Sequence, residues 1–252
     1  MAKRFEDHFS PQAADYARYR PDYPSSLFDW LASVVPRRGV AWDCATGNGQ
    51  AARALASQVE HVVASDASWS QLAAASRHPR VSYVRALAEA CPLRDRSVDL
   101  VTVAQALHWL DLDAFYAEAR RVVVKGGVIA VWSYGRTEID REIDPIVEVL
   151  YSETLGDSWS PERRHVEEGY RSLAFPFATI GTPSLAMTRE WTLDELLGYI
   201  GTWSAFQRHA RERGTEALTD FASRMAAAWG PAERKRVVRW PLAIRAGRLP
   251  GD

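Results

Sequence analysis

The segment from Val40 to Gln50 constrains the fold of this chain more than any other. An apolar run ends with the acid Asp43 and Cys44. Small residues and two glycines follow, and after them comes the helix-forming sequence 51–56. A strand that reverses over small residues into a helix leaves a shallow notch lined by backbone, in which a nucleoside can lie. The segment therefore predicts a nucleoside site at a strand–turn–helix junction.

A second acid, Asp66, ends the next apolar run, which spans residues 61–66. In nucleotide-binding βαβ units, a carboxylate at about this distance from the first strand binds a ribose. Asp43 and Asp66 would end adjacent strands, so the sequence predicts a ribose between them.

Apolar runs and helical patterns alternate through the first half of the chain, as is typical of a parallel sheet covered on both faces. We predict a helix over 26–32 that Ser25 caps, strands near 39–44, 61–66, 81–85, 98–104 and 127–134, and helices near 49–58, 68–77 and 111–124. This order predicts a doubly wound α/β fold.

After residue 135 the alternation stops and longer amphipathic stretches follow. Ser160 and Pro161 resemble a helix start, and Thr192 and Glu195 form a capping box that predicts a helix running through Trp203. A late strand is predicted over 237–244. We therefore expect a single domain, 1–252, with four parts: an N-terminal flap and first helix (1–38), a cofactor-binding core (39–135), a lid (136–191), and helices with a last strand that complete the core (192–252).

Composition narrows the possible functions. The 252 residues carry a formal net charge of −1 with mixed signs along the chain, which disfavours nucleic acid as a partner. The two cysteines form no CxxC pair and the six histidines form no metal-binding motif, so we expect no bound metal. Neither a secretion signal nor an apolar stretch long enough to cross a membrane is visible, and we expect a cytoplasmic protein without a membrane partner.

The spacing of the turn indicates the type of cofactor. Dinucleotide sites use G-x-G-x-x-G to receive a pyrophosphate, whereas Asp43, Ala45, Gly47 and Gly49 alternate here. This spacing favours a cofactor without phosphates and disfavours a dinucleotide oxidoreductase. The turn resembles the first motif of class I S-adenosylmethionine (SAM)-dependent methyltransferases. Ala45 stands where that family usually has glycine, and alanine fits there if its φ is negative.

The resemblance extends along most of the chain. Residues 88–93 look like the family's segment at the adenine edge, where Leu87 replaces a frequent aspartate and Glu89 could substitute. The segments 16–24, 97–109 and 191–204 resemble the type 11 methyltransferases, a set that includes the trans-aconitate methyltransferases. This similarity implies SAM as the cofactor, a Rossmann-like seven-stranded, mostly parallel sheet with helices on both faces, and a helical lid inserted after the fifth strand.

The resemblance also implies roles for individual residues. Arg20 offers a guanidinium fork for the methionine carboxylate, and Tyr16 and Tyr19 would fold over the site with it. The full set of expected cofactor-binding residues is Tyr16, Arg20, Asp43, Ala45, Thr46, Gly47, Gly49, Gln50, Asp66, Ala67, Ala88, Glu89 and Gln105. The expected substrate-binding residues are Tyr19, His108, Trp109, Tyr134 and Trp203, with His108 as the catalytic residue.

Methyl transfer is an in-line displacement that mainly requires alignment and exclusion of water. A carboxylate acceptor is already an anion and needs only orientation, whereas a hydroxyl or amine would use a base such as His108. The resemblance favours methyl ester formation on a small carboxylic acid, with Arg136, Arg163, Arg164 and Arg171 as candidate anion contacts in the lid.

Other functions remain open from the sequence. The acceptor could be another small metabolite methylated on oxygen, nitrogen or carbon, and a protein that binds SAM or its demethylated product without turnover is an alternative from a different class. Methylation of a nucleotide base is disfavoured, because residues 105–108 read Gln-Ala-Leu-His in place of the Asn/Asp-Pro-Pro-aromatic signature. A monomer or a homodimer is expected.

Overall fold

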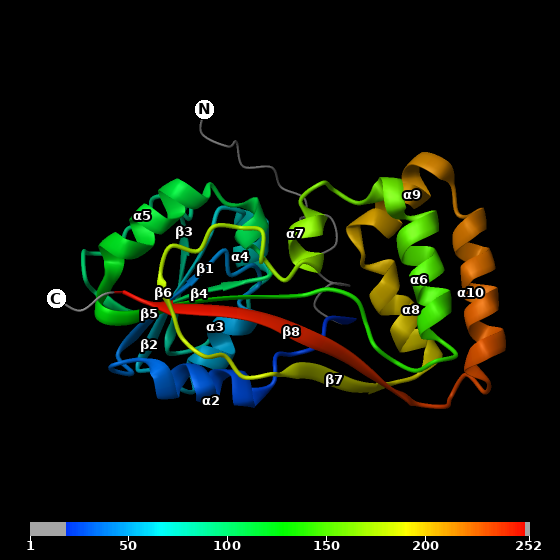
Figure 1. Ribbon diagram of the computed structural model, residues 1–252, viewed down its shortest axis with the longest axis horizontal. Helices are drawn as coiled ribbons and strands as arrows, with labels where there is room; N and C mark the ends of the chain where they lie inside the picture. Colours follow the sequence, from blue (N-terminus) through cyan, green and yellow to red (C-terminus); the bar gives the residue numbers. More distant parts are fainter. Residues whose placement is uncertain (1–18, 250–252) are drawn as a thin grey trace.

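The computed structural model describes residues 19–249, which build a mixed β-sheet and a group of helices beside it (Figure 1). The strands are β1 (Val40–Cys44), β2 (His61–Asp66), β3 (Val81–Arg85), β4 (Val98–Ala104), β5 (Val123–Tyr134), β6 (Ala178–Thr179), β7 (Ala186–Trp191) and β8 (Arg236–Arg248). The helices are α2 (Ser25–Val34), α3 (Gln50–Leu55), α4 (Trp69–Ala73), α5 (Leu112–Val122), α6 (Asp144–Glu148), α7 (Arg163–Glu167), α8 (Leu193–Gly201), α9 (Ser204–Arg213) and α10 (Glu216–Trp229). Short 3₁₀ turns η2 (Leu107–Trp109) and η4 (Gly156–Ser158) and a π-helical turn η3 (Val149–Thr154) complete the list.

The sheet confirms the predicted Rossmann-like fold class. Its strand order is β3-β2-β1-β4-β5-β8-β6, and β7 pairs with β8. The pairs among β1 to β5 are parallel, whereas β8 runs antiparallel to β5. Eight strands take part in place of the expected seven, because β6 and β7 both pair with β8.

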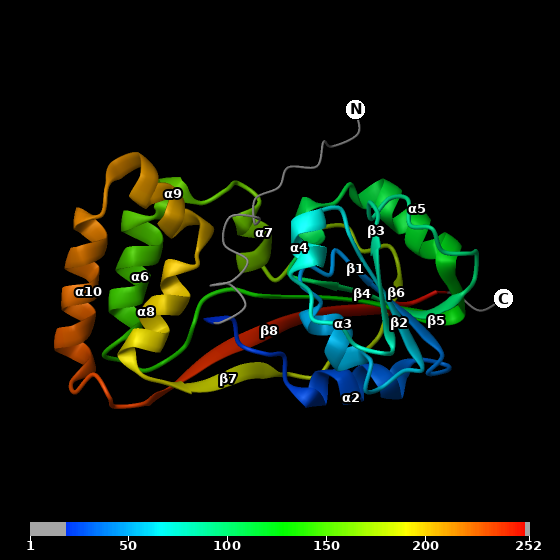
Figure 2. The same cartoon turned by 180° about the vertical axis from the view of Figure 1, so that it is seen from behind.

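Two layers of helices cover the core of the sheet. Figures 1 and 2 place α2 and α3 on one face and α5 on the other. Neighbouring strand residues point to opposite faces, so Ala41 packs in the cluster with α2 and α3, while Trp42 packs with Phe115 of α5. Both faces are therefore buried, which explains why the strands read as nearly continuous apolar runs.

The second half of the chain departs from the predicted arrangement. Residues 136–191 were expected to form a helical lid, but α7 is their last helix, and β6 and β7 follow it. In both views α8, α9 and α10 stand beside α6, away from the parallel strands (Figures 1 and 2). We call α6 with α8–α10 the helical lobe. Its buried residues, such as Leu196 and Trp229, belong to the same apolar cluster as the α2–α3 face of the sheet.

Strand β8 joins the sheet to the helical lobe. Residues from Leu242 onward pair with β5, whereas Arg236 to Pro241 pair with β7. The sequence predicted a shorter strand, 237–244, and did not indicate β6 or β7. In β7 the buried Met187 and Trp191 lie on one side, so period-two alternation was a signal that could have identified it.

Three predicted helix boundaries were wrong. Ser25 is the first residue of α2 and caps nothing, since Pro24 occupies the N-cap. The helix expected at Ser160 begins at Arg163 as α7. The capping box of Thr192 and Glu195 is present, but α8 ends at Gly201, and Trp203 is the N-cap of α9. No helix among residues 19–249 is long and apolar enough to cross a membrane.

Asp43 connects the two central strands. It is fully buried, and in the β1–β4 register it lies opposite Thr102, whose hydroxyl donates to Asp43 Oδ1 over 2.6 Å. The hydroxyl of Thr46 donates to the other oxygen of the same carboxylate. Burial raises the pKa of Asp43 from its usual 3.8 to about 6, although the hydrogen bonds from Thr102 and Thr46 lower it and the charge of Asp66 raises it further. Ionised Asp43 therefore destabilises the folded state at neutral pH.

We expect Asp43→Asn to stabilise the protein at pH 7.5 but not at pH 4. Because the pKa is higher in the folded state, folding stability falls as the pH rises from about 4 to about 6 and stays lower above that range. The asparagine amide has no charge to bury. The gain in the free energy of unfolding of Asp43→Asn over the wild type should therefore be about 1–3 kcal/mol larger at pH 7.5 than at pH 4. Urea unfolding of both proteins at the two pH values measures this difference, and an equal effect at both would contradict the prediction.

Candidate functional site

The candidate site lies at the carboxyl ends of the central parallel strands. The turn 45–49 follows β1, Asp66 ends β2, and Gln105 follows β4. Since β1 pairs in parallel with both β2 and β4, these three segments meet at one edge of the sheet. Ligands of open α/β sheets bind outside this edge.

The turn after β1 has three residues in the left-handed region: Ala45 at φ 52°, Gly47 at 58° and Gly49 at 79°. Ala45 thus has a positive φ, the case in which an alanine at this position introduces local strain. A Cβ on Gly49 would lie 2.3 Å from Tyr83 Oη, so glycine is sterically required there. The turn is compact and presents backbone rather than side chains.

Asp66 holds the turn in place. Its Oδ2 accepts from Gly47 N and its Oδ1 from Ser68 N, each over 2.8 Å. A carboxylate oxygen can accept a further hydrogen bond, so both oxygens retain acceptor capacity for a pair of hydroxyl groups. This half-buried acid beside a backbone-lined turn fits the sugar of an adenosyl cofactor.

Two expected cofactor contacts use their side chains elsewhere. The amide of Gln50 donates to Pro21 O over 2.7 Å, which attaches the segment before α2 to α3. Glu89 accepts from Asp111 N over 3.1 Å, at the start of α5. Both side chains therefore position backbone segments.

Gln105 also bonds to a backbone segment of the protein. Its φ is 58°, and its side chain accepts from Tyr134 N over 2.9 Å and donates to Tyr134 O over 2.8 Å. These bonds clamp the end of β4 to the end of β5. Thr46 similarly gives its hydroxyl proton to Asp43.

The remaining adenine-side candidates are small. Ala67 follows Asp66, and its carbonyl accepts from Arg85 Nε over 3.2 Å, while Ala88 is buried after β3. Trp69, which no sequence motif indicated, begins α4 close in the chain to Asp66 and is 66% exposed. Leu87, just after β3, is 50% exposed. Large exposed apolar side chains of this kind are candidate ligand contacts.

The segment before α2 reaches from the sheet to the helical lobe. Tyr16 lies outside the described residues. Arg20 donates to Tyr134 Oη over 2.8 Å, and its guanidinium stacks on the rings of Tyr134 and Tyr199 at 5.9 and 5.4 Å. Tyr19 lies against Gly198 of α8, where a Cβ would approach its ring to 2.5 Å. Arg20 and Tyr134, predicted for different ligands, are thus direct partners.

His108 lies in η2, just beyond β4, as predicted. Its Nδ1 is 3.1 Å from the hydroxyl of Tyr170, and its ring lies 4.7 Å from that of Trp109. Tyr170 is fully buried in the left-handed region, at φ 61°. No sequence motif marked Tyr170, because it lies 62 residues from His108 in the chain.

Trp203 belongs to an aromatic cluster within the helical lobe. It is 6% exposed and packs against Tyr151, Trp159 and Tyr199 at ring distances of 5.6, 5.8 and 5.9 Å. It therefore lies behind other rings, in contrast to Trp109, which is only half-buried beside His108.

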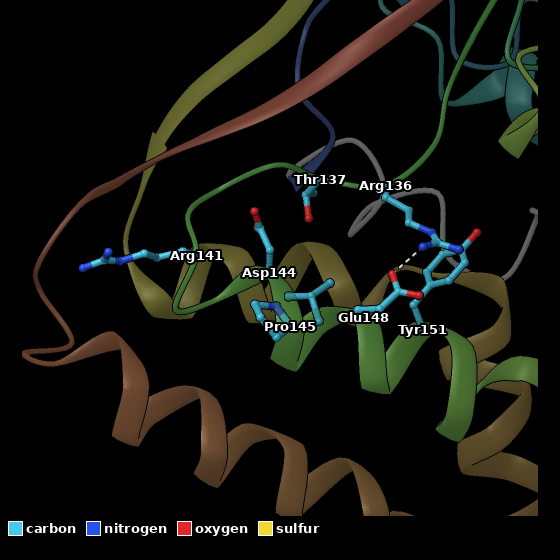
Figure 3. A pocket seen from close by; sticks show the side chains of 8 residues that line it. Arg136, Thr137, Arg141, Asp144, Pro145, Glu148 and Tyr151 are labelled. Atoms are coloured by element: carbon cyan, nitrogen blue, oxygen red, sulfur yellow. Dashed lines mark hydrogen bonds and ion pairs between the residues drawn. The ribbon is translucent and has the colours of Figure 1, made fainter.

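A pocket of about 460 Å³ lies next to this cluster, between α6 and the segment after β5 (Figure 3). Arg136 pairs there with Glu148 and stacks on Tyr151 at 4.8 Å. The buried Thr137 lines the same pocket. Arg136 is therefore already neutralised by an acid.

Arg163 of α7 differs from the other arginines predicted as anion contacts. It stacks on Trp159 at 4.8 Å and on Tyr151 at 5.5 Å, and its Nε donates to Tyr151 Oη over 2.7 Å. Within residues 19–249 no carboxylate oxygen comes within 4.0 Å of its nitrogens, whereas Arg164 and Arg171 are exposed. Helix α7, which carries this half-buried cation, packs against η2, the turn that carries His108.

The described part of the chain contains no group of three or more His, Cys, Asp or Glu side chains arranged to hold a metal ion. The site consists instead of a backbone turn, one acid, aromatic rings and arginines.

Comparison with known proteins agrees with this geometry. A family described as a methyltransferase domain matches residues 42–131. A proposed methyltransferase of Dictyostelium discoideum is 31% identical over 222 residues, which cover 86% of this chain and 84% of that protein. An uncharacterized methyltransferase of Mycobacterium bovis is 30% identical, with coverage of 78% and 76%.

A solved structure of a proposed type II methyltransferase from Anaeromyxobacter dehalogenans is also similar. It is 49% identical, with a TM-score of 0.88, and the alignment covers 92% of this chain and 99% of that one. The similarity spans both the sheet and the helical lobe. The chain therefore belongs to the class I SAM-dependent methyltransferases and uses SAM as its methyl donor.

Proposed function

We propose that this enzyme transfers the methyl group of SAM to a carboxylate oxygen of a small organic acid and so forms a methyl ester. The observation that carries this proposal is Arg163, a half-buried cation on the helix that packs against the turn of His108, with no ion-pair partner among the described residues. A guanidinium held between aromatic rings is well suited to bind a carboxylate, since it presents paired donors in a fixed plane.

The cofactor is held by the turn after β1 and by Asp66 in this proposal. The backbone of Gly47 and Gly49 faces the adenosyl group, both oxygens of Asp66 accept from the ribose hydroxyls, and Trp69 and Leu87 cover the adenine. Arg20 would bind the methionine carboxylate from the segment before α2. The bound cofactor supplies an electrophilic methyl group on a sulfonium.

The residues around the acceptor mainly orient it. A carboxylate is ionised at neutral pH, so no proton has to be removed before transfer. Arg163 would bind one carboxylate group, His108 and Trp109 would lie beside the reacting oxygen, and the rings of Tyr151 and Trp159 would keep Arg163 in place. An acid with two or more carboxylates fits best, because one can be bound by Arg163 while another reacts.

We expect Asp66→Ala to weaken binding of S-adenosylhomocysteine by about 1–3 kcal/mol, the value of charge-assisted hydrogen bonds to the ribose. Calorimetric titration measures the affinity. Asp95→Ala is the control, since the Asp95 side chain is 74% exposed and pairs with Arg121 away from this edge. The thermal unfolding temperature of Asp66→Ala, compared with that of the wild type, shows whether the lost hydrogen bond to Gly47 N destabilises the fold. Unchanged affinity in Asp66→Ala would refute this placement of the ribose.

We expect Arg163→Gln to lower kcat/KM for an acid acceptor by about 10- to 100-fold, because one charge-assisted pair is lost. The affinity for S-adenosylhomocysteine should not change. Arg164→Gln is a matched control, as Arg164 is the exposed neighbour on the same helix.

The acceptor itself is identified with a panel of mono-, di- and tricarboxylic acids, phenols and amines and a labelled methyl donor. Base-labile label on the acids supports the proposal. Transfer only to nitrogen or carbon acceptors would refute ester formation, and binding without any turnover would favour a non-catalytic SAM-binding protein.

We further propose a cytoplasmic location, with a monomer or a homodimer as the active form. Both cysteines of the chain, Cys44 and Cys91, are buried and free. Burial raises the pKa of Cys91 to about 11, so this thiol is unreactive at neutral pH. Such cysteines are typical of a reducing compartment.

A further inference from the structure

We propose that Tyr170 is a positioning residue that holds His108 as the tautomer with its proton on Nε2, so that His108 donates a hydrogen bond to the acceptor and does not act as a base. The inference rests on the proposed function, which places His108 beside the acceptor. It assigns a role to a buried tyrosine that no sequence motif indicated.

Among residues 19–249, the hydroxyl of Tyr170 has one hydrogen-bond partner, His108 Nδ1, which lies 3.1 Å from the phenol oxygen. A phenol hydroxyl can donate its proton or accept at its oxygen, and a histidine nitrogen does either according to the tautomer. A buried phenol proton requires an acceptor.

His108 Nδ1 is the acceptor available for that proton. Tyr170 is fully buried, and within the described part of the chain its hydroxyl has no further hydrogen-bond partner. If Nδ1 carried a proton, it would donate to the phenol oxygen, and the buried phenol proton would be unsatisfied. Burial also raises the pKa of Tyr170 well above its usual range, although Arg163 opposes this, so the phenol keeps its proton. A neutral imidazole that accepts at Nδ1 carries its proton on Nε2.

The backbone of Tyr170 has an unfavourable conformation that neighbouring residues hold in place. Gly169 and Tyr170 are both left-handed, at φ 58° and 61°, a conformation that is strained for tyrosine. The guanidinium of Arg245, on β8, donates to the carbonyls of Tyr170 and Leu173 and so holds the strained residue. Strand β8 thus fixes the tyrosine, and the tyrosine fixes the histidine.

The consequence is a constraint on the acceptor. A neutral histidine with its proton on Nε2 can donate to an acceptor oxygen, which favours an anionic carboxylate over a hydroxyl or amine that must first lose a proton. His108 and Arg163 would then stabilise and orient the same anionic substrate.

Nitrogen NMR of the full chain with ¹⁵N-labelled histidine tests the tautomer directly. The protein is studied with S-adenosylhomocysteine bound, and the His108 signals are assigned by their loss in His108→Gln. We expect a protonated Nε2 and an unprotonated Nδ1 at neutral pH. In Tyr170→Phe the ratio of the two tautomers should fall by about 2- to 10-fold toward Nδ1–H, the effect of one neutral hydrogen bond.

Tyr116→Phe is the matched control, since Tyr116 is also buried but donates to Ala174 O over 2.8 Å. It should leave the His108 signals unchanged. A wild-type His108 with its proton on Nδ1, or an unchanged ratio in Tyr170→Phe, would overturn the inference.

A second measurement does not depend on the stability of the tyrosine variant. With the acid acceptor, His108→Gln keeps a donor and should retain at least 10-fold more activity than His108→Leu, whereas equal losses would indicate a base and overturn the inference. The NMR experiment needs no acceptor, so its result is independent of the acceptor panel that tests the proposed function.

Discussion

Parallel pairing of β1 with β2 on one side and β4 on the other is the constraint on which the rest of the structure depends. Because all three strands end at one edge, the turn 45–49, Asp66 and Gln105 meet there although they span about a quarter of the chain. The buried Asp43 joins β1 to β4 through Thr102 and joins the turn through Thr46. Burial of that carboxylate reduces stability at neutral pH, yet its bond with Thr46 orders the turn after β1.

Residues with positive φ gather around this edge, and hydrogen bonds hold the backbone at or next to them. Gly47 N next to the left-handed Ala45 is bound by Asp66, the side chain of Gln105 is bonded to Tyr134, and Arg245 donates to the carbonyl of Tyr170. Such pairs restrict the positions of the turn, the end of β4 and His108. A methyltransferase depends on alignment of donor and acceptor, so rigid placement of these groups matches the demands of the reaction.

Helix α7 and the helical lobe supply cations and aromatic rings beside the sheet. Helix α7 places Arg163 against Tyr151 and Trp159, and Arg20 lies between the rings of Tyr134 and Tyr199, which come from the sheet and from α8. Aromatic rings and stacked guanidinium groups thus form the boundary between the two parts. Strand β8 pairs with β5 in the sheet and with β7, which leads into α8, and so connects the two parts.

The local pattern of the sequence was sufficient for the parallel strands, the turn after β1 and the acid at the end of β2, because period, spacing and small residues act over a few neighbours in the chain. It also indicated SAM through the alternating glycines and the resemblance they carry. Only the tertiary structure decided that Ala45 is left-handed, that Glu89 and Gln50 serve the backbone, and that α8–α10 join α6 in a lobe. It alone paired His108 with Tyr170 and left Arg163 without an acidic partner among residues 19–249, because contacts between residues tens of positions apart depend on packing that no local pattern encodes.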